Sequence, residues 1–187
     1  MPVASNRVDR SLVRRAGQWF VYTHFRILEF LLRLLPLPLV FLIGEGAGLL
    51  FYLGLPGYRK LAVRNMTIAF GRERTPEEIR SMARASFLRL GGNLLSSLVL
   101  PRIGREAIDE RVEVIYEKGA REGQQGSSGV IFCIPHMGAW ELFSQLPELF
   151  TGDLAPSTMY QTLRNPFFDA YVRRRRATMG LQLFDRG

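Results

Sequence analysis

The sequence predicts an α/β domain, with helices packed on a mixed sheet, preceded by a hydrophobic helical segment. Two observations predict this class. Residues 34–58 form an apolar stretch that carries a single charged side chain, whereas the residues after it alternate between helical and strand-like patterns. We therefore expect two parts, a helical membrane-anchoring segment over residues 1–57 and an α/β domain over residues 58–187.

Composition narrows the class of partner. The 187 residues include 25 Lys and Arg against 17 Asp and Glu, which gives a net charge of +8. A hydrophobic content of 47% excludes a disordered chain. The basic balance points to an anionic partner such as a membrane surface, an acidic substrate or nucleic acid. The single cysteine, Cys133, excludes an intrachain disulfide and a cysteine-based zinc site.

The apolar stretch is predicted to anchor the chain in a membrane. A spanning helix needs about 20 predominantly apolar residues, and here Pro36, Pro38 and Glu45 interrupt the run. Basic residues flank both ends, so charge gives no clear preference for a single crossing. Three arrangements therefore stay open: a monotopic or re-entrant anchor, a spanning helix, or a buried helical hairpin of a soluble protein.

Two of the helices predicted in the domain that follows begin with recognisable N-caps. Thr75 stands at the N-cap position of the first, with Pro76 at its first position and Glu78 at its third, which is the pattern of a capping box. Apolar residues then recur at helical spacing until a proline ends the run. The second helix begins after Asn165, an N-cap residue that is followed by proline.

Four short segments are expected to form strands. Residues 112–116 alternate apolar and polar side chains, as a half-buried strand does. Residues 130–134 form a continuous apolar run that is typical of a buried strand. Residues 181–184 supply a third strand, and residues 157–161 are a candidate for a fourth.

The run at residues 130–134 leads into a pair of polar side chains. His136 follows the run, and Glu141 stands in the first turn of the next predicted helix. On one continuous helix the two side chains would lie about 140° apart, so they meet only if the chain turns at Gly138, a residue that permits such a turn. A carboxylate beside an imidazole raises its basicity and makes it a general base for a hydroxyl. The alternative is a histidine satisfied by backbone groups beside a solvated glutamate.

Several segments together resemble a known family. The sequence from His136 to Glu141 resembles the first block of the glycerolipid and lysophospholipid acyltransferases. Its context is similar to their lipid A branch, the late acyltransferases that add secondary acyl chains to the lipopolysaccharide anchor. The further segments that carry this resemblance are residues 58–70, 129–136, 160–166 and 180–186.

The resemblance implies a mechanism and a site. His136 would deprotonate a hydroxyl of a 3-hydroxyacyl chain on a phosphorylated disaccharide, and Glu141 would orient the imidazole. Backbone amides near Gly138 would hold the developing oxyanion. Arg164, Arg173 and Arg186 would hold phosphates of the substrate or carrier. The acyl donor would be a thioester on acyl carrier protein or on coenzyme A, without a metal and without any other cofactor.

The same resemblance sets the expected fold, location and partners. It implies a glycerolipid-acyltransferase-like sheet with flanking helices, of which this chain holds an incomplete, N-terminal portion. The expected location is the cytoplasmic face of the cell inner membrane. The expected partners are a membrane lipid substrate, acyl carrier protein and an anionic membrane surface, with no nucleic acid.

Alternatives remain from the residues alone. The first alternative is an acyltransferase that acts on another lipid, such as a lysophospholipid, an ornithine lipid or a mannosylated inositol lipid. The chain is otherwise a non-catalytic basic protein that binds membranes or nucleic acid. For the arginine run at residues 173–176 the alternative is a solvated helix face near anionic lipid, and for Arg186 it is an exposed chain end.

Overall fold

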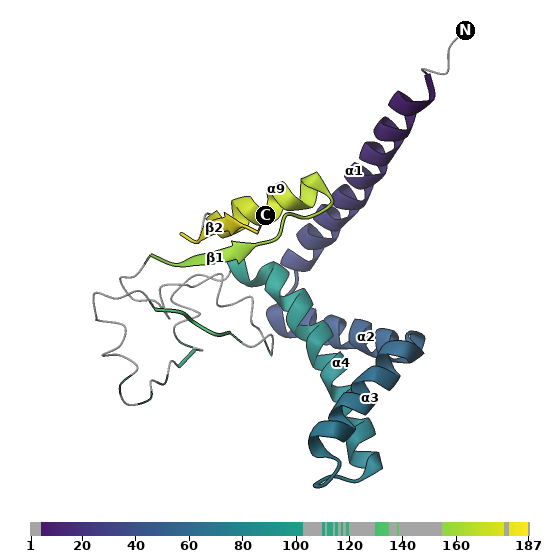
Figure 1. The fold of residues 1–187 in the computed structure, drawn as a ribbon, viewed down its shortest axis with the longest axis vertical. Coiled ribbons are helices and arrows are strands. Elements are labelled where there is room, and N and C mark those ends of the chain that lie inside the picture. The colour runs from purple at the N-terminus through teal and green to yellow at the C-terminus, as the bar shows by residue number, and fades with distance from the viewer. Residues whose placement is uncertain are drawn as a thin grey trace. The chain divides into compact units, whose positions relative to one another are not determined.

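The structure is a computed structural model (Figure 1). It describes residues 5–102, 110, 112–113, 115, 117, 119, 130–134, 138, 155–177 and 180–186. The chain divides into two compact units. The first unit contains the N-terminal helix as far as residue 31 together with the described residues from 110 to 134 and from 155 to 186. The second unit contains residues 32–102 and Gly138.

Residues 5–102 are mostly helical. The elements are α1 (Ser5–Arg33), α2 (Leu37–Gly54), α3 (Pro56–Phe70), α4 (Pro76–Val99) and the short 3-10 helix η1 (Leu100–Arg102). Prolines set two of the boundaries, because proline lacks an N–H and disfavours a helical conformation in the residue before it. Pro36 is the N-cap residue of α2, and Pro56 is the first residue of α3.

The start of α4 confirms the predicted capping box. The Glu78 amide donates to the Thr75 hydroxyl oxygen at 3.3 Å, and the Thr75 amide donates to the Glu78 carboxylate at 2.8 Å. The bond from the Thr75 amide is also the main reason why the pKa of Glu78 lies below its ordinary value. The predicted N-terminus of this helix is therefore correct to the residue.

Helices α2 and α4 approach each other closely at glycines. A methyl group at Gly48 would lie 2.2 Å from the carbonyl oxygen of Phe87, and one at Gly44 would lie 2.5 Å from that of Gly91. Side chains do not fit at either place, so the two backbones come into direct contact. The four-residue spacing of the two glycines is the one that lets apolar helices pack tightly in membranes.

The core of the second unit lies beside this contact. Leu32, Val40 and Val99 are buried, and four partly buried leucines pack against them: Leu35, Leu37, Leu95 and Leu98. At the edge of the helix pair, Arg89 of α4 donates to Glu45 of α2 at 2.9 Å. Arg89 is 67% exposed, so this ion pair contributes little to the free energy of unfolding. Apolar and backbone contacts therefore hold α2 against α4.

The first unit contains a β-α-β arrangement. Strand β1 (Ser157–Tyr160) leads through helix α9 (Pro166–Ala177) to strand β2 (Gln182–Asp185), and the two strands pair in parallel. Parallel neighbours need a crossover connection, which a helix commonly supplies. The strands expected at residues 157–161 and 181–184 are thus confirmed. They support the α/β class, although the described part of the chain shows a two-stranded parallel sheet rather than a mixed one.

The start of α9 also agrees with the sequence. The amides of Phe167 and Phe168 donate to Asn165 Oδ1 at 3.0 and 3.5 Å, so Asn165 caps the helix as predicted. Pro166 follows as the first helical residue, where its missing N–H costs nothing.

One face of α1 packs against α9. Aromatic rings from the two helices meet with centroids 4.9 to 6.4 Å apart: Tyr22 and Phe25 on α1, and Phe167, Phe168 and Tyr171 on α9. Most of these pairs are tilted or edge-to-face, which the charge distribution of aromatic rings favours. Helix α1 is therefore part of the packed first unit.

A buried carboxylate lies in the contact between α1 and α9. Glu29 is 1% exposed and accepts a hydrogen bond from the Tyr171 hydroxyl at 2.7 Å. Arg26 and Arg175 form ion pairs with it at 3.4 and 4.0 Å. Burial of a carboxylate is costly unless such partners are present. Burial, and then donation to Glu29, raises the pKa of Tyr171.

The opposite face of α1 is apolar and exposed. Phe20, Ile27 and Leu31 lie on one side of the helix, because spacings of seven and four residues return to the same face, and their exposed fractions are 59%, 51% and 52%. Helix α2 is also largely exposed, with 17% of its apolar 18-residue window buried. Within the described residues, α2 is the helix whose length and mean hydropathy of 1.7 suffice to cross a membrane.

The expectation of a buried strand at residues 130–134 is wrong. These residues lie outside regular strands, and Ile131 is 91% exposed. An apolar run becomes a strand only where a neighbour supplies ladder hydrogen bonds, and among the described residues β1 and β2 pair only with each other. Residues 112, 113 and 115 also lie outside regular strands, whereas the rest of the segment at 112–116 falls outside the described residues.

Candidate functional site

Of the predicted catalytic segment, residues 136–141, the structure describes one residue, Gly138. His136 and Glu141 lie outside the described residues. Gly138 is exposed and has a φ of 61°. That value belongs to the left-handed region, where glycine pays no steric cost and other residues are strained. The backbone at Gly138 therefore has a left-handed conformation, and the expected meeting of His136 and Glu141 stays a prediction.

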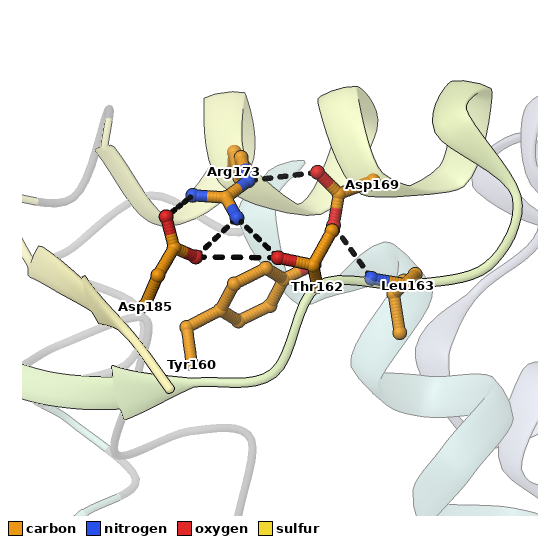
Figure 2. A network of polar contacts seen from close by, with 6 residues as sticks. All are labelled: Tyr160, Thr162, Leu163, Asp169, Arg173 and Asp185. Carbon is orange, nitrogen blue, oxygen red and sulfur yellow. Dashed lines mark hydrogen bonds and ion pairs between the residues drawn. The ribbon is translucent and has the colours of Figure 1, made fainter. Parts of the chain in front are cut away.

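A network of polar contacts links α9 to both strands of the sheet (Figure 2). At its centre is Arg173 of α9, whose Nε donates to Asp169 Oδ2 at 2.7 Å. The same guanidinium donates through Nη1 to Asp185 Oδ2 at 3.3 Å and through Nη2 to Asp185 Oδ1. Nη2 also donates to the Thr162 hydroxyl at 3.0 Å. Every nitrogen of the Arg173 guanidinium thus contacts an acceptor within the first unit.

Asp169 forms the second centre of the network. The Tyr160 hydroxyl donates to Asp169 Oδ1 at 2.9 Å, and the Leu163 amide donates to the same oxygen at 2.8 Å. Asp169 thereby connects α9 to the end of β1 and to the loop that follows it. Its position four residues before Arg173 places both side chains on one face of the helix.

The charges of the network stabilise one another. Hydrogen bonding to Arg173 is the main cause that lowers the pKa of Asp185. Burial alone would raise the pKa of Asp169, but donation by the Leu163 amide, Arg173 and Tyr160 outweighs it and leaves that pKa below the ordinary value. Hydrogen bonds to Asp185 and then to Asp169 raise the pKa of Arg173. Both carboxylates and the guanidinium are therefore held in their charged forms.

Arg164 stands just before α9 with an exposed side chain. Its carbonyl oxygen accepts from Gln18 Nε2 at 3.2 Å, and the neighbouring Asn165 Nδ2 donates to the Gln18 carbonyl at 3.0 Å. These bonds fix the backbone of Arg164 against α1. An exposed guanidinium on a fixed backbone is suited to binding a phosphate.

Arg186 follows the last residue of β2. Its amide donates to the Tyr160 carbonyl at 2.8 Å, which extends the pairing of the two strands by one residue. Successive side chains of an extended chain point to opposite faces, so Arg186 shares a face with the exposed Phe184 and lies opposite Asp185. Like Arg164, it combines a fixed backbone with an exposed guanidinium.

Sequence reasoning assigned Arg173 to substrate and gave Asp169 no role. The signal that was available is the spacing of an aspartate four residues before an arginine, which predicts an ion pair on a helix. The pairing with Asp185 had no local signal, because β2 must first lie beside β1. No group of three or more His, Cys, Asp or Glu side chains that could hold a metal occurs among the described residues.

Comparison with known proteins agrees with the resemblance noted in the sequence. A family model described as bacterial lipid A biosynthesis acyltransferase matches residues 7–187. No curated protein and no solved structure gives a significant match. The matched span contains the polar network and also the segment from His136 to Glu141. The chain therefore belongs to the bacterial lipid A biosynthesis acyltransferase family, and its activity is that of an acyltransferase.

Proposed function

We propose that this protein moves a fatty acyl chain from an acyl thioester to a hydroxyl group of a lipid A precursor. The observation that carries the proposal is the family match over residues 7–187, a span that includes both candidate catalytic residues, His136 and Glu141. The left-handed backbone at Gly138 supports it, since a turn at this position is what allows the two side chains to meet.

The proposed reaction is a direct transfer. The His136 imidazole takes the proton of the acceptor hydroxyl while its oxygen attacks the thioester carbonyl carbon, and Glu141 orients the imidazole and stabilises its charged form. Backbone amides near Gly138 stabilise the oxyanion of the tetrahedral intermediate. The carbon–sulfur bond then breaks, and the departing thiolate receives the proton from the imidazolium. The acyl thioester, on acyl carrier protein or coenzyme A, is the co-substrate.

Arg164 and Arg186 are the proposed phosphate contacts. Both carry an exposed guanidinium on a backbone that hydrogen bonds fix in place. A phosphorylated disaccharide offers acceptors that arginine binds with two parallel hydrogen bonds.

We place the protein at the cytoplasmic face of the inner membrane. The support comes from α1, which packs against α9 with one face and exposes Phe20, Ile27 and Leu31 on the other. A helix with such an apolar face, in a protein with a net positive charge, is suited to lie at the surface of a bilayer that contains anionic lipid. The same surface would bring the site to a membrane-borne lipid substrate, while acyl carrier protein approaches from the aqueous side.

The experiment that tests the proposal replaces the base. We expect His136→Ala to lower the rate of acyl transfer by about 10²- to 10⁴-fold, with membrane attachment unchanged. The assay supplies an acyl thioester and a phosphorylated lipid A precursor to the membrane-bound protein, and mass spectrometry detects the added acyl chain. Parallel reactions with a lysophospholipid acceptor test the lipid class.

His24→Ala is the matched control, because His24 is the second of the two histidines in the sequence. It is exposed on α1, and its Nδ1 lies 2.9 Å from the Phe20 carbonyl oxygen. We expect this variant to transfer acyl chains at the rate of the unaltered protein. Unimpaired turnover in His136→Ala would contradict the assignment of the base, and transfer only to the lysophospholipid would contradict the acceptor.

A further inference from the structure

Arg173 stands apart from the other arginines of the candidate site, because its partners lie within the protein. All three guanidinium nitrogens contact oxygens of Asp169, Asp185 or Thr162. The centre of the guanidinium also lies 4.6 Å from the centroid of the Tyr160 ring, at a distance typical of a cation–π contact. Each nitrogen and one face of the group are thus occupied by protein contacts, although the side chain is 32% exposed.

The residue that Arg173 holds is the last one of β2. The Asp185 carboxylate accepts hydrogen bonds from two of the guanidinium nitrogens, so both of its oxygens are held in place. The hydroxyl of Thr162, a residue on the loop after β1, lies 3.4 Å from the same carboxylate. Asp185 therefore cannot rotate or shift along the strand without breaking contacts with α9 and with this loop (Figure 2).

The next residue is held from the other side. The Arg186 amide donates to the Tyr160 carbonyl, and Tyr160 itself is attached through its hydroxyl to Asp169 of α9. Two restraints therefore converge on the short segment from which the Arg186 side chain projects. One acts through the Asp185 side chain, and the other acts through the Arg186 backbone.

We infer that Arg173 is a positioning residue, which clamps Asp185 and thereby fixes the direction in which Arg186 leaves the sheet toward a phosphate of the substrate. This inference rests on the proposed function, in which Arg186 binds phosphate. It assigns Arg173 a role different from the substrate contact expected from sequence. The carboxylate partners of Arg173 come from its own helix, α9, and from strand β2. Its guanidinium therefore holds these two elements together and does not bind the ligand itself.

The test is a double-mutant cycle in the membrane-bound protein. Arg173→Gln and Asp185→Asn each remove one side of the clamp, and we expect each to raise KM for the phosphorylated acceptor, with a loss in kcat/KM of up to about 10²-fold. The double variant should lose no more than the single variants, because both changes break the same contact. Partial unfolding alone would lower apparent kcat and leave KM unchanged.

Arg174→Gln is the matched control on the same helix. Arg174 carries the same charge one position further along and is exposed, so its loss should leave KM unchanged. The inference is overturned if Asp185→Asn keeps the KM of the unaltered protein while Arg173→Gln does not, since Arg173 would then contact substrate itself. Additive losses in the double variant, or an equal effect of Arg174→Gln, would overturn it as well.

A second measurement tests, without any assay of activity, whether Arg173 holds this segment in place. Two amides of the segment are held by β1 and the residue before it, because Gln182 donates to the Pro156 carbonyl at 2.9 Å and Arg186 donates to the Tyr160 carbonyl at 2.8 Å. Hydrogen exchange in peptides that cover residues 181–186 should become faster in Arg173→Gln and stay unchanged in Arg174→Gln. Equal exchange in the two variants would overturn the inference. If the unaltered protein transferred no acyl chain, the proposed function would fail, and hydrogen exchange would still decide the clamp.

Discussion

Tyr160 illustrates how one side chain combines packing with charge. It is 5% exposed, and its ring lies beneath the guanidinium groups of Arg173 and Arg176, at 4.6 and 5.7 Å from the centroid. Its hydroxyl donates to Asp169. Burial, and then this donation to a carboxylate, raises the pKa of Tyr160 to about 12, although the two arginines act in the opposite direction.

This shift predicts a loss of stability in alkali. An unfolded tyrosine ionises near its ordinary pKa of 10.0, whereas Tyr160 in the folded protein keeps its proton until about 12. The unfolded state therefore binds fewer protons across this interval, and the free energy of unfolding falls as pH rises through it. The effect of this one group is at most about 2–3 kcal/mol. Urea unfolding in detergent at a series of pH values measures it.

Tyr160→Phe should show a smaller alkaline loss, because the variant has no proton to release at this position. Tyr58→Phe is the control, since Tyr58 is 66% exposed on α3. An identical pH dependence in Tyr160→Phe and the unaltered protein would contradict the prediction.

Residues with local signals could be predicted, and residues with distant partners could not. Asn165 was identified as a cap because a cap needs only the next few residues of the same chain segment. The sequence predicted that Arg173 binds phosphate, and we propose the clamp in place of that role. Its partner Asp185 lies 12 residues further along and meets it only after β2 has paired with β1. The roles of His136 and Glu141 also stay predictions, because both lie outside the described residues.

At the scale of elements, the contact between α2 and α4 depends on two glycines. We expect Gly48→Ala to lower the free energy of unfolding by about 1–3 kcal/mol, because the added methyl group would lie 2.2 Å from the Phe87 carbonyl oxygen and the helices would have to separate. Thermal unfolding in detergent, followed by circular dichroism at the helix band, measures the change.

Gly46→Ala provides the matched control for this substitution. Gly46 lies on the same helix, and a methyl group there would have nothing within 4 Å. Alanine forms helices better than glycine by about 1 kcal/mol, so this variant should be as stable as the unaltered protein or more so. Equal effects of the two substitutions would show that helix propensity rather than packing decides the outcome.

Elements whose ends carry local chemistry were predicted well. Thr75 and Glu78 satisfy each other's amides within one turn, so the start of α4 follows from four consecutive residues. The run at residues 130–134 failed for the opposite reason, because apolar composition does not create the neighbouring strand that an extended segment needs. The glycine contact between α2 and α4 also lacked a local signal, since it joins residues far apart in the sequence, Gly44 to Gly91 and Gly48 to Phe87.

At the scale of the whole molecule, we expect apolar exposure and positive charge to act on the same partner, an anionic membrane surface. Helix α2 and the outer face of α1 expose large apolar side chains, and the chain carries a net charge of +8. We expect 1 M salt to leave the protein with the membrane fraction and detergent to release it, because salt at this concentration shortens electrostatic interactions to about 3 Å and leaves apolar burial intact.

Sedimentation after each wash, with detection by immunoblot, measures this distribution. Release by salt alone would indicate a basic protein bound to an anionic surface and would contradict an apolar anchor. Of the three arrangements expected from the sequence, the spanning helix is the one in which α2 crosses the bilayer. The boundary expected at residue 57 stays a prediction.

The contact between Glu29 and Tyr171 has a consequence in time. These residues are separated by 142 positions, and at about 5–20 residues per second the ribosome needs about 7–28 s to make the intervening chain. During that interval Tyr22 and Phe25 have no α9 to pack against, and the inner face of α1 is as unprotected as the outer one. A nascent α1 would therefore aggregate in water unless a bilayer or a chaperone binds it first. One of its two apolar faces is buried only after α9 has been synthesised and packs against it.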